Sequence, residues 1–512
     1  MSLNPIAKIF LVCVCGLLLS LSAPGYDLWF IAWFGLAPLF IFLNIEKKLG
    51  KLVLYSFVFG FIYNFCYLYW LFSLHPLDWL GFSNNESFFI SVLALITVAF
   101  YNSLYFIIFA ILVFYLKKYS VPPYNKDIPH LLLITFIWLI VFNKLASCKC
   151  LLGFPWTLIE YSQYKNLFLI QIAEYFGSIS ISFLIVFFNL LVAQFLIWQF
   201  GVEKISGRYV SKAPGQVTSL IRGFSLITIL ILLSIGFGAF SYKENKQWVS
   251  RKSKEVSVIQ GDLPLKVTRG GKQDINFAKK TYGNLISKSN ADLVISPEGA
   301  LPTIFNEDAG TQYWLKTISK SRVLDVISGT YCRETKNNLT NCAVSSSQVS
   351  DEFSYYEKQR LVPFGEFTPF SSLLPNALKA FASNLIGDGF VEGKENKPVK
   401  TSLGKVGVNI CFELIFPEII RKHTLQGANF LVNVSDLSWF SSNLLKKQFF
   451  SFAVFRAIEN RKWSIIAANN GISAFIEPSG KIKSQSLPNT QGTLSELINP
   501  NNKVTFYARY GW

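Results

Sequence analysis

The chain has 512 residues, of which 51% are hydrophobic and 15% charged, so it is long enough for two or more domains and far more apolar than an average soluble protein. Its formal net charge is +17, but no basic, aromatic-interleaved motif accompanies that charge, which argues against nucleic acid as a partner. Positive charge in short loops between apolar runs instead favours a protein embedded in a membrane that contains anionic lipid.

The apolar excess is confined to the part of the chain before about Tyr242, and it predicts seven membrane helices because one span needs ~20 mainly apolar residues. The first run leads through "SLSAPGYDLW" directly into a second, which favours a retained helix over a cleaved signal peptide. We expect the helices at about residues 6–23, 28–44, 52–74, 88–116, 131–147, 167–198 and 220–242. The predicted domains are therefore 1–245 in the membrane, 246–505 as a second domain, and a tail at 506–512.

The loops that follow the second, fourth and sixth apolar runs carry most of the basic residues of this half. Positive loops stay in the cytoplasm, so the N-terminus is predicted to lie inside. An odd number of crossings then places the second half outside, which for a bacterial inner-membrane protein is the periplasm. The basic residues of the three loops are Lys47, Lys48, Lys51, Lys117, Lys118, Lys126, Lys204, Arg208 and Lys212.

The segment "GFPWTLIEYSQ" (153–163) is an irregular, partly polar stretch between the fifth and sixth runs. Polar sequence near membrane depth is costly and usually has a role. Trp156, Tyr161 and Gln163 are compatible with an interfacial loop near the outer headgroups, or with an ordinary aromatic belt. The sequence leaves both readings open.

From about Lys254 onward, short apolar strands alternate with amphipathic helices. "VSVIQ", "ADLVISPE", "VLDVISGTYC", "KVGVNI" and "NFLVNVS" read as strands, and "QDINFAKKTYGNLISKS" and "KKQFFSFAVFRAIENR" as helices. This alternation with short connections predicts a layered α/β sandwich.

Three chemically distinctive residues each stand where a predicted strand meets a loop, and α/β proteins place their sites there. They are Glu298, Lys358 and Cys411. A thiol is nucleophilic as thiolate, so Glu298 is the candidate base and Lys358 the candidate cation that stabilises an oxyanion. We expect a helix with Pro417 in its first turn to direct its positive N-terminus toward Cys411.

The cysteines of the chain allow other arrangements. A Cys–His pair has only His423 available in this half of the chain. Cys332 and Cys342 flank a hairpin-like loop and are able to pair in an oxidising compartment. Cys148 and Cys150 lack a second pair at metal-binding spacing, so no metal site is predicted.

Three ordered motifs, "SPEGALP", "KQRLVPFGEFTP" and "GVNICFELIFPE", resemble the catalytic blocks of the carbon–nitrogen hydrolase (nitrilase) superfamily. With the preceding apolar helices and "GFPWTLIEYSQ", the chain resembles the apolipoprotein N-acyltransferase family over nearly its whole length. The resemblance implies a multi-pass α-helical membrane domain followed by an α-β-β-α sandwich.

The same resemblance implies a Glu298–Lys358–Cys411 triad, supported by Glu366, Glu413 and the neighbouring Phe412, with no cofactor or metal. Gly365 would permit the bend that aims Glu366 inward. Glu413, at the start of the helix after the nucleophile, would orient Lys358 through a charge-assisted contact.

The implied reaction moves an acyl chain from a phospholipid to Cys411 as a thioester. The acyl chain then passes to the free amine of the diacylglyceryl cysteine that begins an apolipoprotein, with a monomeric enzyme in the bacterial inner membrane. Two alternatives remain at this stage. One is a membrane-anchored nitrilase-type amidase, and the other is a non-enzymatic membrane binding module.

The chain departs from the family pattern at several places. Phe412 stands where a tyrosine is usual, and a tryptophan expected near Arg269 is missing. "NVSDLSWF" replaces the common "NVSNDAWF", and the usual eighth helix does not follow residue 505. The triad itself is intact.

Overall fold

The computed structural model describes residues 4–119, 128–200, 216–246, 253–268, 272–333, 335, 338–371, 389–394 and 397–511. The expected departure at Arg269 and the basic loop at Lys204–Lys212 lie outside these residues. The chain divides into two compact units. The first comprises Met1–Pro76, Asn84–Ala173 and Gly177–Ala239, and the second comprises Leu77–Ser83, Glu174–Phe176 and Phe240–Trp512.

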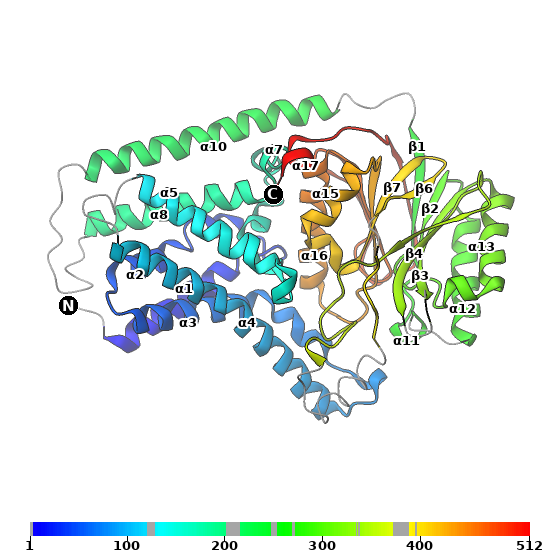
Figure 1. Ribbon diagram of the computed structural model, residues 1–512, viewed down its shortest axis with the longest axis horizontal. Coiled ribbons are helices and arrows are strands. Elements are labelled where there is room, and N and C mark those ends of the chain that lie inside the picture. The colour runs from blue at the N-terminus through cyan, green and yellow to red at the C-terminus, as the bar shows by residue number, and fades with distance from the viewer. Residues whose placement is uncertain are drawn as a thin grey trace. The chain divides into compact units, whose positions relative to one another are not determined.

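The first half is helical, and each of the seven apolar runs contains at least one helix (Figure 1). Its main helices are α1 (Pro5–Ser20), α2 (Ala37–Ile45), α3 (Leu49–Tyr67), α4 (Asn84–Tyr119), α5 (Ile128–Trp138), α6 (Leu167–Ile170), α7 (Ala173–Phe176), α8 (Ile179–Phe200) and α10 (Gln216–Lys246). Five helical segments among the described residues are long and apolar enough to cross a membrane: 49–67, 84–119, 128–147, 179–200 and 217–243.

Two predicted spans differ from expectation. The run at 6–23 forms the 16-residue α1, and the run at 28–44 is divided between a 3₁₀ turn (Trp29–Trp33) and α2. The long run at 167–198 is also interrupted, because Gly177 adopts φ 74° and ends α7 before α8 begins. The number of crossings therefore stays a prediction.

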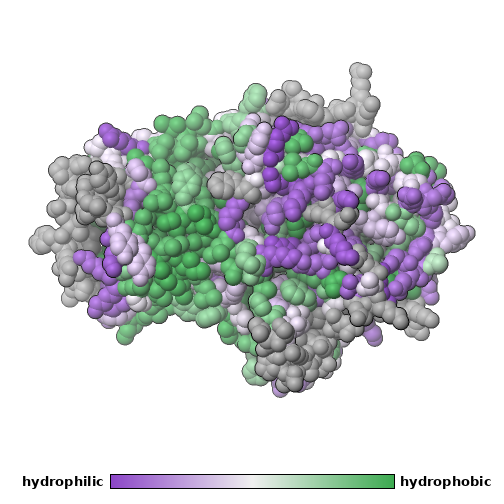
Figure 2. Space-filling view, viewed as in Figure 1, coloured by the Kyte–Doolittle hydropathy of each residue, from purple (hydrophilic) through white to green (hydrophobic). Residues whose placement is uncertain are grey.

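Large apolar side chains remain exposed on this unit, as expected for a surface that faces lipid. Phe10, Leu93 and Leu233 are 70%, 64% and 64% exposed. Figure 2 shows hydrophobic residues gathered over these helices, whereas polar residues are frequent over the α/β unit.

The segment 153–163 is packed inside the helical unit, so its aromatic side chains do not form an exposed belt. It forms two 3₁₀ turns, Pro155–Thr157 and Ile159–Gln163, and Trp156, Tyr161 and Gln163 are all buried. Irregular backbone at membrane depth is tolerated where it is buried in protein and its polar groups are satisfied. Its partners come from the surrounding helices: Tyr63 donates to the Thr157 carbonyl at 2.8 Å, and Trp33 donates to Gln163 at 3.2 Å.

The second unit contains two six-stranded mixed sheets (Figure 1). The first has the order β12-β1-β2-β3-β4-β5 and the second β11-β10-β9-β8-β7-β6. The strands are β1 (Lys254–Gln260), β2 (Leu293–Ile295), β3 (Asp325–Arg333), β4 (Leu339–Ser346), β5 (Phe353–Glu357), β6 (Val399–Thr401), β7 (Gly404–Ile410), β8 (Phe430–Ser435), β9 (Ser464–Ala468), β10 (Ala474–Ile476), β11 (Ile482–Gln485) and β12 (Gly492–Ile498).

The two sheets pack face to face over one apolar core, with residues such as Val258 and Ile327 from the first sheet and Val408 and Val432 from the second, all fully buried. Helices α12 (Lys272–Ser287) and α13 (Ala309–Arg322) cover the outer face of the first sheet, and α15 (Pro417–Leu425) and α16 (Asn443–Asn460) cover that of the second (Figure 1). The expected α-β-β-α sandwich is confirmed. The tail contains the short helix α17 (Phe506–Tyr510).

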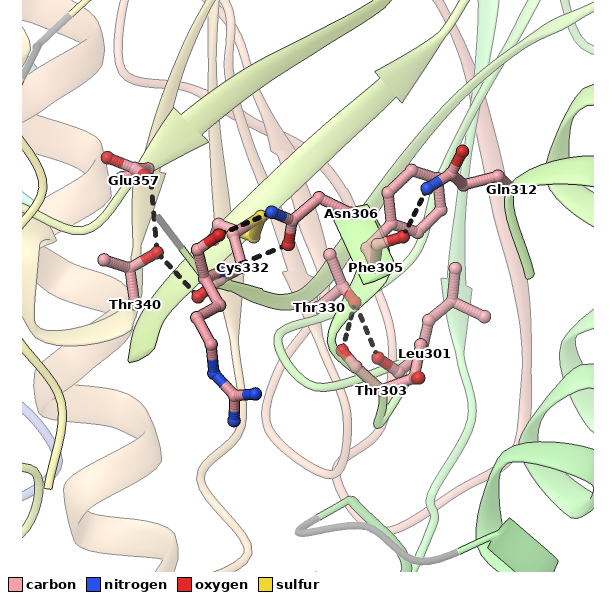
Figure 3. Close-up of a disulfide and its surroundings, with 11 residues drawn as sticks. Leu301, Thr303, Phe305, Asn306, Gln312, Thr330, Cys332, Thr340 and Glu357 are labelled. Atoms are coloured by element: carbon pink, nitrogen blue, oxygen red, sulfur yellow. Dashed lines mark hydrogen bonds between the residues drawn. A yellow bond between two sulfur atoms is a disulfide. The ribbon is translucent and has the colours of Figure 1, made fainter. Parts of the chain in front are cut away.

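Two pairs of cysteines are joined. Cys332 on β3 and Cys342 on β4 form a disulfide across the hairpin (Figure 3), which confirms that this pairing is available to the fold. Cys148 and Cys150 form the second disulfide. Cys411 is among the four cysteines that remain free.

Candidate active site

The three residues singled out from the sequence stand at strand ends of the two sheets, as predicted. Glu298 follows β2, Lys358 follows β5 and Cys411 follows β7. The turn at Glu298 lies directly against β3, where a Cβ on Gly329 would come within 2.5 Å of the Glu298 Cα. Glycine at position 329 therefore allows the turn at Glu298 to approach the sheet.

The structure brings the charged groups into one buried cluster. The Lys358 ammonium lies 3.2 Å from Glu298 Oε1 and 2.7 Å from Glu366 Oε1. The Lys358 side chain is 1% exposed. A buried ammonium is tolerated because two carboxylates surround it.

Burial opposes the charge on Lys358, but the neighbouring carboxylates of Glu298 and Glu366 outweigh this effect and raise the lysine pKa. The ammonium therefore stays protonated across the physiological pH range. It is a fixed positive charge beside the thiol rather than a proton donor, which suits stabilisation of an oxyanion.

Cys411 lies at a sharp strand-to-helix bend and has φ 49°, a left-handed conformation that is rare for a residue with a side chain. Burial, and then the negative charge of Glu298, raise the pKa of its thiol, while Lys358 acts in the opposite direction. The charges of Glu298 and Lys358 both act on the thiol, so the three groups lie close together. The thiol is therefore protonated at rest and has a carboxylate in place to receive its proton.

Glu366 is held in the cluster by the loop that follows Lys358. Its Oε2 accepts a hydrogen bond from the Val362 amide at 2.8 Å, while its own amide donates to the Val362 carbonyl at 2.9 Å. Gly365 lies in the turn before Glu366, as expected, but the residue with positive φ in that turn is Phe364, at 61°. Gly365 matters for space, since a Cβ there would come within 3.1 Å of Val362.

Glu413 lies in a 3₁₀ turn (Cys411–Ile415), and α15 begins only at Pro417. The N-terminus at the nucleophile therefore belongs to this 3₁₀ turn, which begins at Cys411, and not to α15 as expected. Glu413 is fully buried, and burial raises its pKa to about 7 against the opposing effect of backbone hydrogen bonds.

The contacts of Glu413 connect the nucleophile turn to the lysine segment. Its Oε1 accepts from the amides of Gln359 and Arg360 at 2.5 and 3.1 Å, and its Oε2 accepts from the Ile410 amide and the Tyr356 hydroxyl at 2.7 and 2.9 Å. We expected a direct contact with Lys358; the carboxylate instead binds the backbone that follows Lys358.

Phe412 and His423 have structural positions. Phe412 is 6% exposed and packs edge-on against Phe416 at 5.2 Å. His423 is fully buried with its ring against Tyr356 at 5.2 Å, and burial lowers its pKa to about 3. The Cys–His alternative has no support, because the charges that act on the thiol are those of Glu298, Lys358 and Glu366, and the histidine lies within the packed core.

Two contributors were missed in the sequence. Asn341, inside β4, donates to both Glu298 and Glu366. Asp436, just after β8, donates its backbone amide to Glu298 Oε2 at 2.8 Å. An asparagine within a buried strand carries no sequence signal, and a backbone donor is independent of residue type. In the described part of the chain, no group of three or more His, Cys, Asp or Glu is arranged to hold a metal ion.

A buried carboxylate and ammonium beside a partly buried thiol, at the strand ends of an α-β-β-α sandwich, mark the second unit as a carbon–nitrogen hydrolase domain. The carbon–nitrogen hydrolase family model matches residues 251–503. Among solved structures, the carbon–nitrogen hydrolase of Helicobacter pylori G27 is 16% identical, with a TM-score of 0.38, and the match covers 48% of this chain and 90% of that one.

The first unit is also matched, by the apolipoprotein N-acyltransferase N-terminal domain model over residues 15–191. The apolipoprotein N-acyltransferase of Geobacter metallireducens is 30% identical over 510 residues, which cover 97% of this chain and 90% of that protein. The Nostoc protein of the same name is 28% identical over 501 residues, covering 96% and 94%. The chain belongs to the apolipoprotein N-acyltransferase family, and it is a multi-pass membrane protein.

Proposed function

We propose that this protein transfers an acyl chain from a phospholipid, through a thioester on Cys411, to the N-terminal amine of an S-diacylglyceryl cysteine on an apolipoprotein. The relatives bear the name of this activity, and the site contains the groups that such a transfer needs. Glu298, Lys358 and Cys411 are the catalytic residues, and Glu366 and Glu413 support them.

In the first half-reaction, Glu298 removes the proton of the Cys411 thiol, and the thiolate attacks the ester carbonyl carbon of the phospholipid. The Lys358 ammonium stabilises the negative oxygen of the tetrahedral intermediate. When the intermediate collapses, the C–O bond breaks and Glu298 returns its proton to the leaving alkoxide. The products are a lysophospholipid and the acyl-enzyme.

In the second half-reaction, the amine of the acceptor attacks the thioester carbonyl. Glu298 takes the proton that the attacking nitrogen loses, the C–S bond breaks, and that proton returns to the Cys411 thiolate. The site is regenerated without any net change in charge. Each half-reaction breaks one bond, forms one bond and returns its proton, so this balance requires no further cofactor.

The observation that carries the proposal is the meeting of the Cys411 thiol, the Glu298 carboxylate and a buried ammonium: Lys358 Nζ lies 3.2 Å from Glu298 Oε1, and both charges act on the thiol. A cysteine that only filled space would need neither partner.

The test is mass spectrometry of the purified protein after incubation with phospholipid vesicles and no acceptor. We expect a single acyl adduct on a peptide containing Cys411, sensitive to hydroxylamine, and its discharge when an amine acceptor is added. Cys411→Ala should lose the adduct and reduce transfer by ~10⁴-fold or more. Cys13→Ala removes a free cysteine of the first unit and should leave both unchanged.

The same experiment separates the alternatives. Release of free fatty acid at a rate equal to adduct formation would show a hydrolase of the amidase type. Unchanged transfer by the Cys411→Ala protein would contradict catalysis through this site and leave a binding role.

We propose further that residues 246–505 act on the periplasmic side of the bacterial inner membrane, that residues 1–245 anchor them, and that one chain suffices, since all triad residues come from one chain. In a Cys411→Ala background, an impermeant maleimide should label Val349→Cys, at a position 75% exposed in the second unit, in intact spheroplasts. It should label Lys47→Cys only after lysis. The reverse pattern would contradict this orientation.

A further inference from the structure

Asn341 lies inside β4, opposite Tyr331 of β3, and its side chain is buried, with the residue 3% exposed. Its Nδ2 donates to Glu298 Oε1 at 2.7 Å and to Glu366 Oε1 at 2.9 Å. One amide group therefore joins two of the carboxylates of the site.

The same two oxygens also accept hydrogen bonds from the Lys358 ammonium, at 3.2 and 2.7 Å. Two donors and two acceptors thus form a closed arrangement in which each donor contacts both acceptors. The cluster contains two carboxylates and one ammonium. The amide supplies the second pair of hydrogen bonds without introducing a further charge.

The chemistry of the neighbours determines the orientation of the amide. Rotating it by 180° would place the carbonyl oxygen against two carboxylate oxygens, which repel it. In the observed orientation Oδ1 is buried and has no hydrogen-bond partner among the described residues. A buried unpaired acceptor lowers stability, so fold stability alone does not account for an asparagine here.

We propose that Asn341 is a positioning residue for acyl transfer, whose amide fixes the two glutamates so that Glu298 stays directed at Cys411. This inference deepens the proposed function and rests on it. The side-chain amide of Asn341 contacts Glu298 and Glu366. It acts through Glu298 and Glu366.

The groups that face Glu298 come from several elements. Lys358 and Glu366 follow β5, Cys411 follows β7, and the backbone amide of Asp436 follows β8. The Lys358 ammonium, the Asn341 amide and the Asp436 backbone amide all donate to the Glu298 carboxylate, and Glu366 places a second negative charge beside it. Removing the Asn341 amide subtracts one donor and leaves the repulsion between the two carboxylates less compensated.

Position 340 offers a matched control on the same strand. Thr340 is buried, and its hydroxyl donates to the Cys332 carbonyl and to Glu357 Oε1, each at 3.2 Å (Figure 3). Because neighbouring side chains of a strand point to opposite faces, Thr340 shares the strand, the burial and the adjacent disulfide of Asn341 without contacting the two glutamates of the cluster.

The experiment is the single-turnover rate of acyl-adduct formation on Cys411, with phosphatidylethanolamine vesicles, measured between pH 5 and 9 for the full-length wild type, Asn341→Ala, Asn341→Asp and Thr340→Val. For Asn341→Ala we expect a rate at least tenfold lower at pH 6, and an acid limb moved upward by about one pH unit or more, from the loss of hydrogen bonds to a charged group. At pH 9 the rate should largely recover. Thr340→Val should keep the wild-type profile.

Asn341→Asp adds a third carboxylate, so we expect an acid limb still further upward and a larger loss at every pH. If the Asn341→Ala protein is unstable, the Asn341→Asp protein tests the inference in its place. A double variant with Glu366→Gln should lose less than the product of the two single losses, because the residues act as one unit.

An acid limb that stays in place in both Asn341 variants would overturn the inference, as would an equal shift in Thr340→Val. If the wild type forms no adduct on Cys411, the proposed function fails instead. The two failures are therefore distinguishable.

Discussion

Each unit of this protein buries a polar cluster around glutamate, and the two clusters are built differently. In the first unit, Glu160 is fully buried and accepts hydrogen bonds from Asn143 Nδ2 at 2.7 Å and Ser182 Oγ at 2.5 Å. In the second unit, Glu298 and Glu366 share a buried ammonium, and Glu298 adjoins a thiol.

The difference follows from what each cluster must do. The Glu160 cluster satisfies an irregular segment inside a helical bundle, and an amide and a hydroxyl are among its donors. The second cluster must keep a base ionised in an apolar surrounding and stabilise a negative charge during reaction, which requires a fixed cation. Variants that change charge at constant shape test this distinction.

The largest effect within the charged cluster is expected for the partners of Cys411. Glu298→Gln keeps the shape but removes the base, and should lower the rate of adduct formation by ~10²–10⁴-fold. Lys358→Arg keeps the charge, but a planar guanidinium does not replace a compact ammonium between two carboxylates, so a loss of ~10²–10³-fold is expected. Single-turnover kinetics check both, and near-normal turnover by Glu298→Gln would reject its role as base.

Variants of the supporting residues Glu366 and Glu413 should lower the reaction rates less than variants of Glu298 and Lys358. Glu366→Ala leaves Lys358 and Asn341 with one carboxylate, and Glu413→Ala loosens the turn at Cys411, so we expect each to slow adduct formation by ~10-fold or more. Adduct formation and transfer to an amine acceptor are measured separately. If both rates stay within about threefold of wild type in both variants, the supporting role is wrong.

The pH dependence of stability tests the protonation state of Glu413. Its pKa rises from an ordinary value of 4.5 to about 7 in the folded protein, so folding favours the protonated form. The associated stability is complete below pH 4.5 and is lost as pH rises through about 7. The Tm of the wild type in detergent should therefore fall between pH 5 and 8, and that of Glu413→Gln should fall less. An equal slope would contradict this protonation.

The smallest effect on chemistry is expected in the first unit. Glu160→Gln keeps the shape but turns an amide toward the donor of Asn143, which should lower Tm because a buried hydrogen bond is lost. Adduct formation on Cys411, normalised to folded protein, should stay within about threefold of wild type. The exposed Glu86→Gln is the control for Tm. A changed pH profile of adduct formation in Glu160→Gln would show that the two clusters are coupled.

The sequence alone was sufficient for the second unit's fold class and for its three principal side chains. Alternating strands and helices predict the layers, and Glu298, Lys358 and Cys411 each follow an apolar strand. These are local properties, since strand periodicity and the residue types at strand ends depend on nearby sequence. The motif resemblance raised the three from plausible residues to a triad.

Only the tertiary structure showed how the site is held. Asn341 and the Asp436 amide reach Glu298 from strands that are distant in sequence, and Glu413 binds backbone of a different segment. The positive φ in the turn before Glu366 falls on Phe364 rather than on Gly365. The segment 153–163 is buried although its composition suggests a membrane surface. Such features depend on which strands and helices become neighbours, and hydrogen bonding across that distance leaves no periodic signal in the sequence.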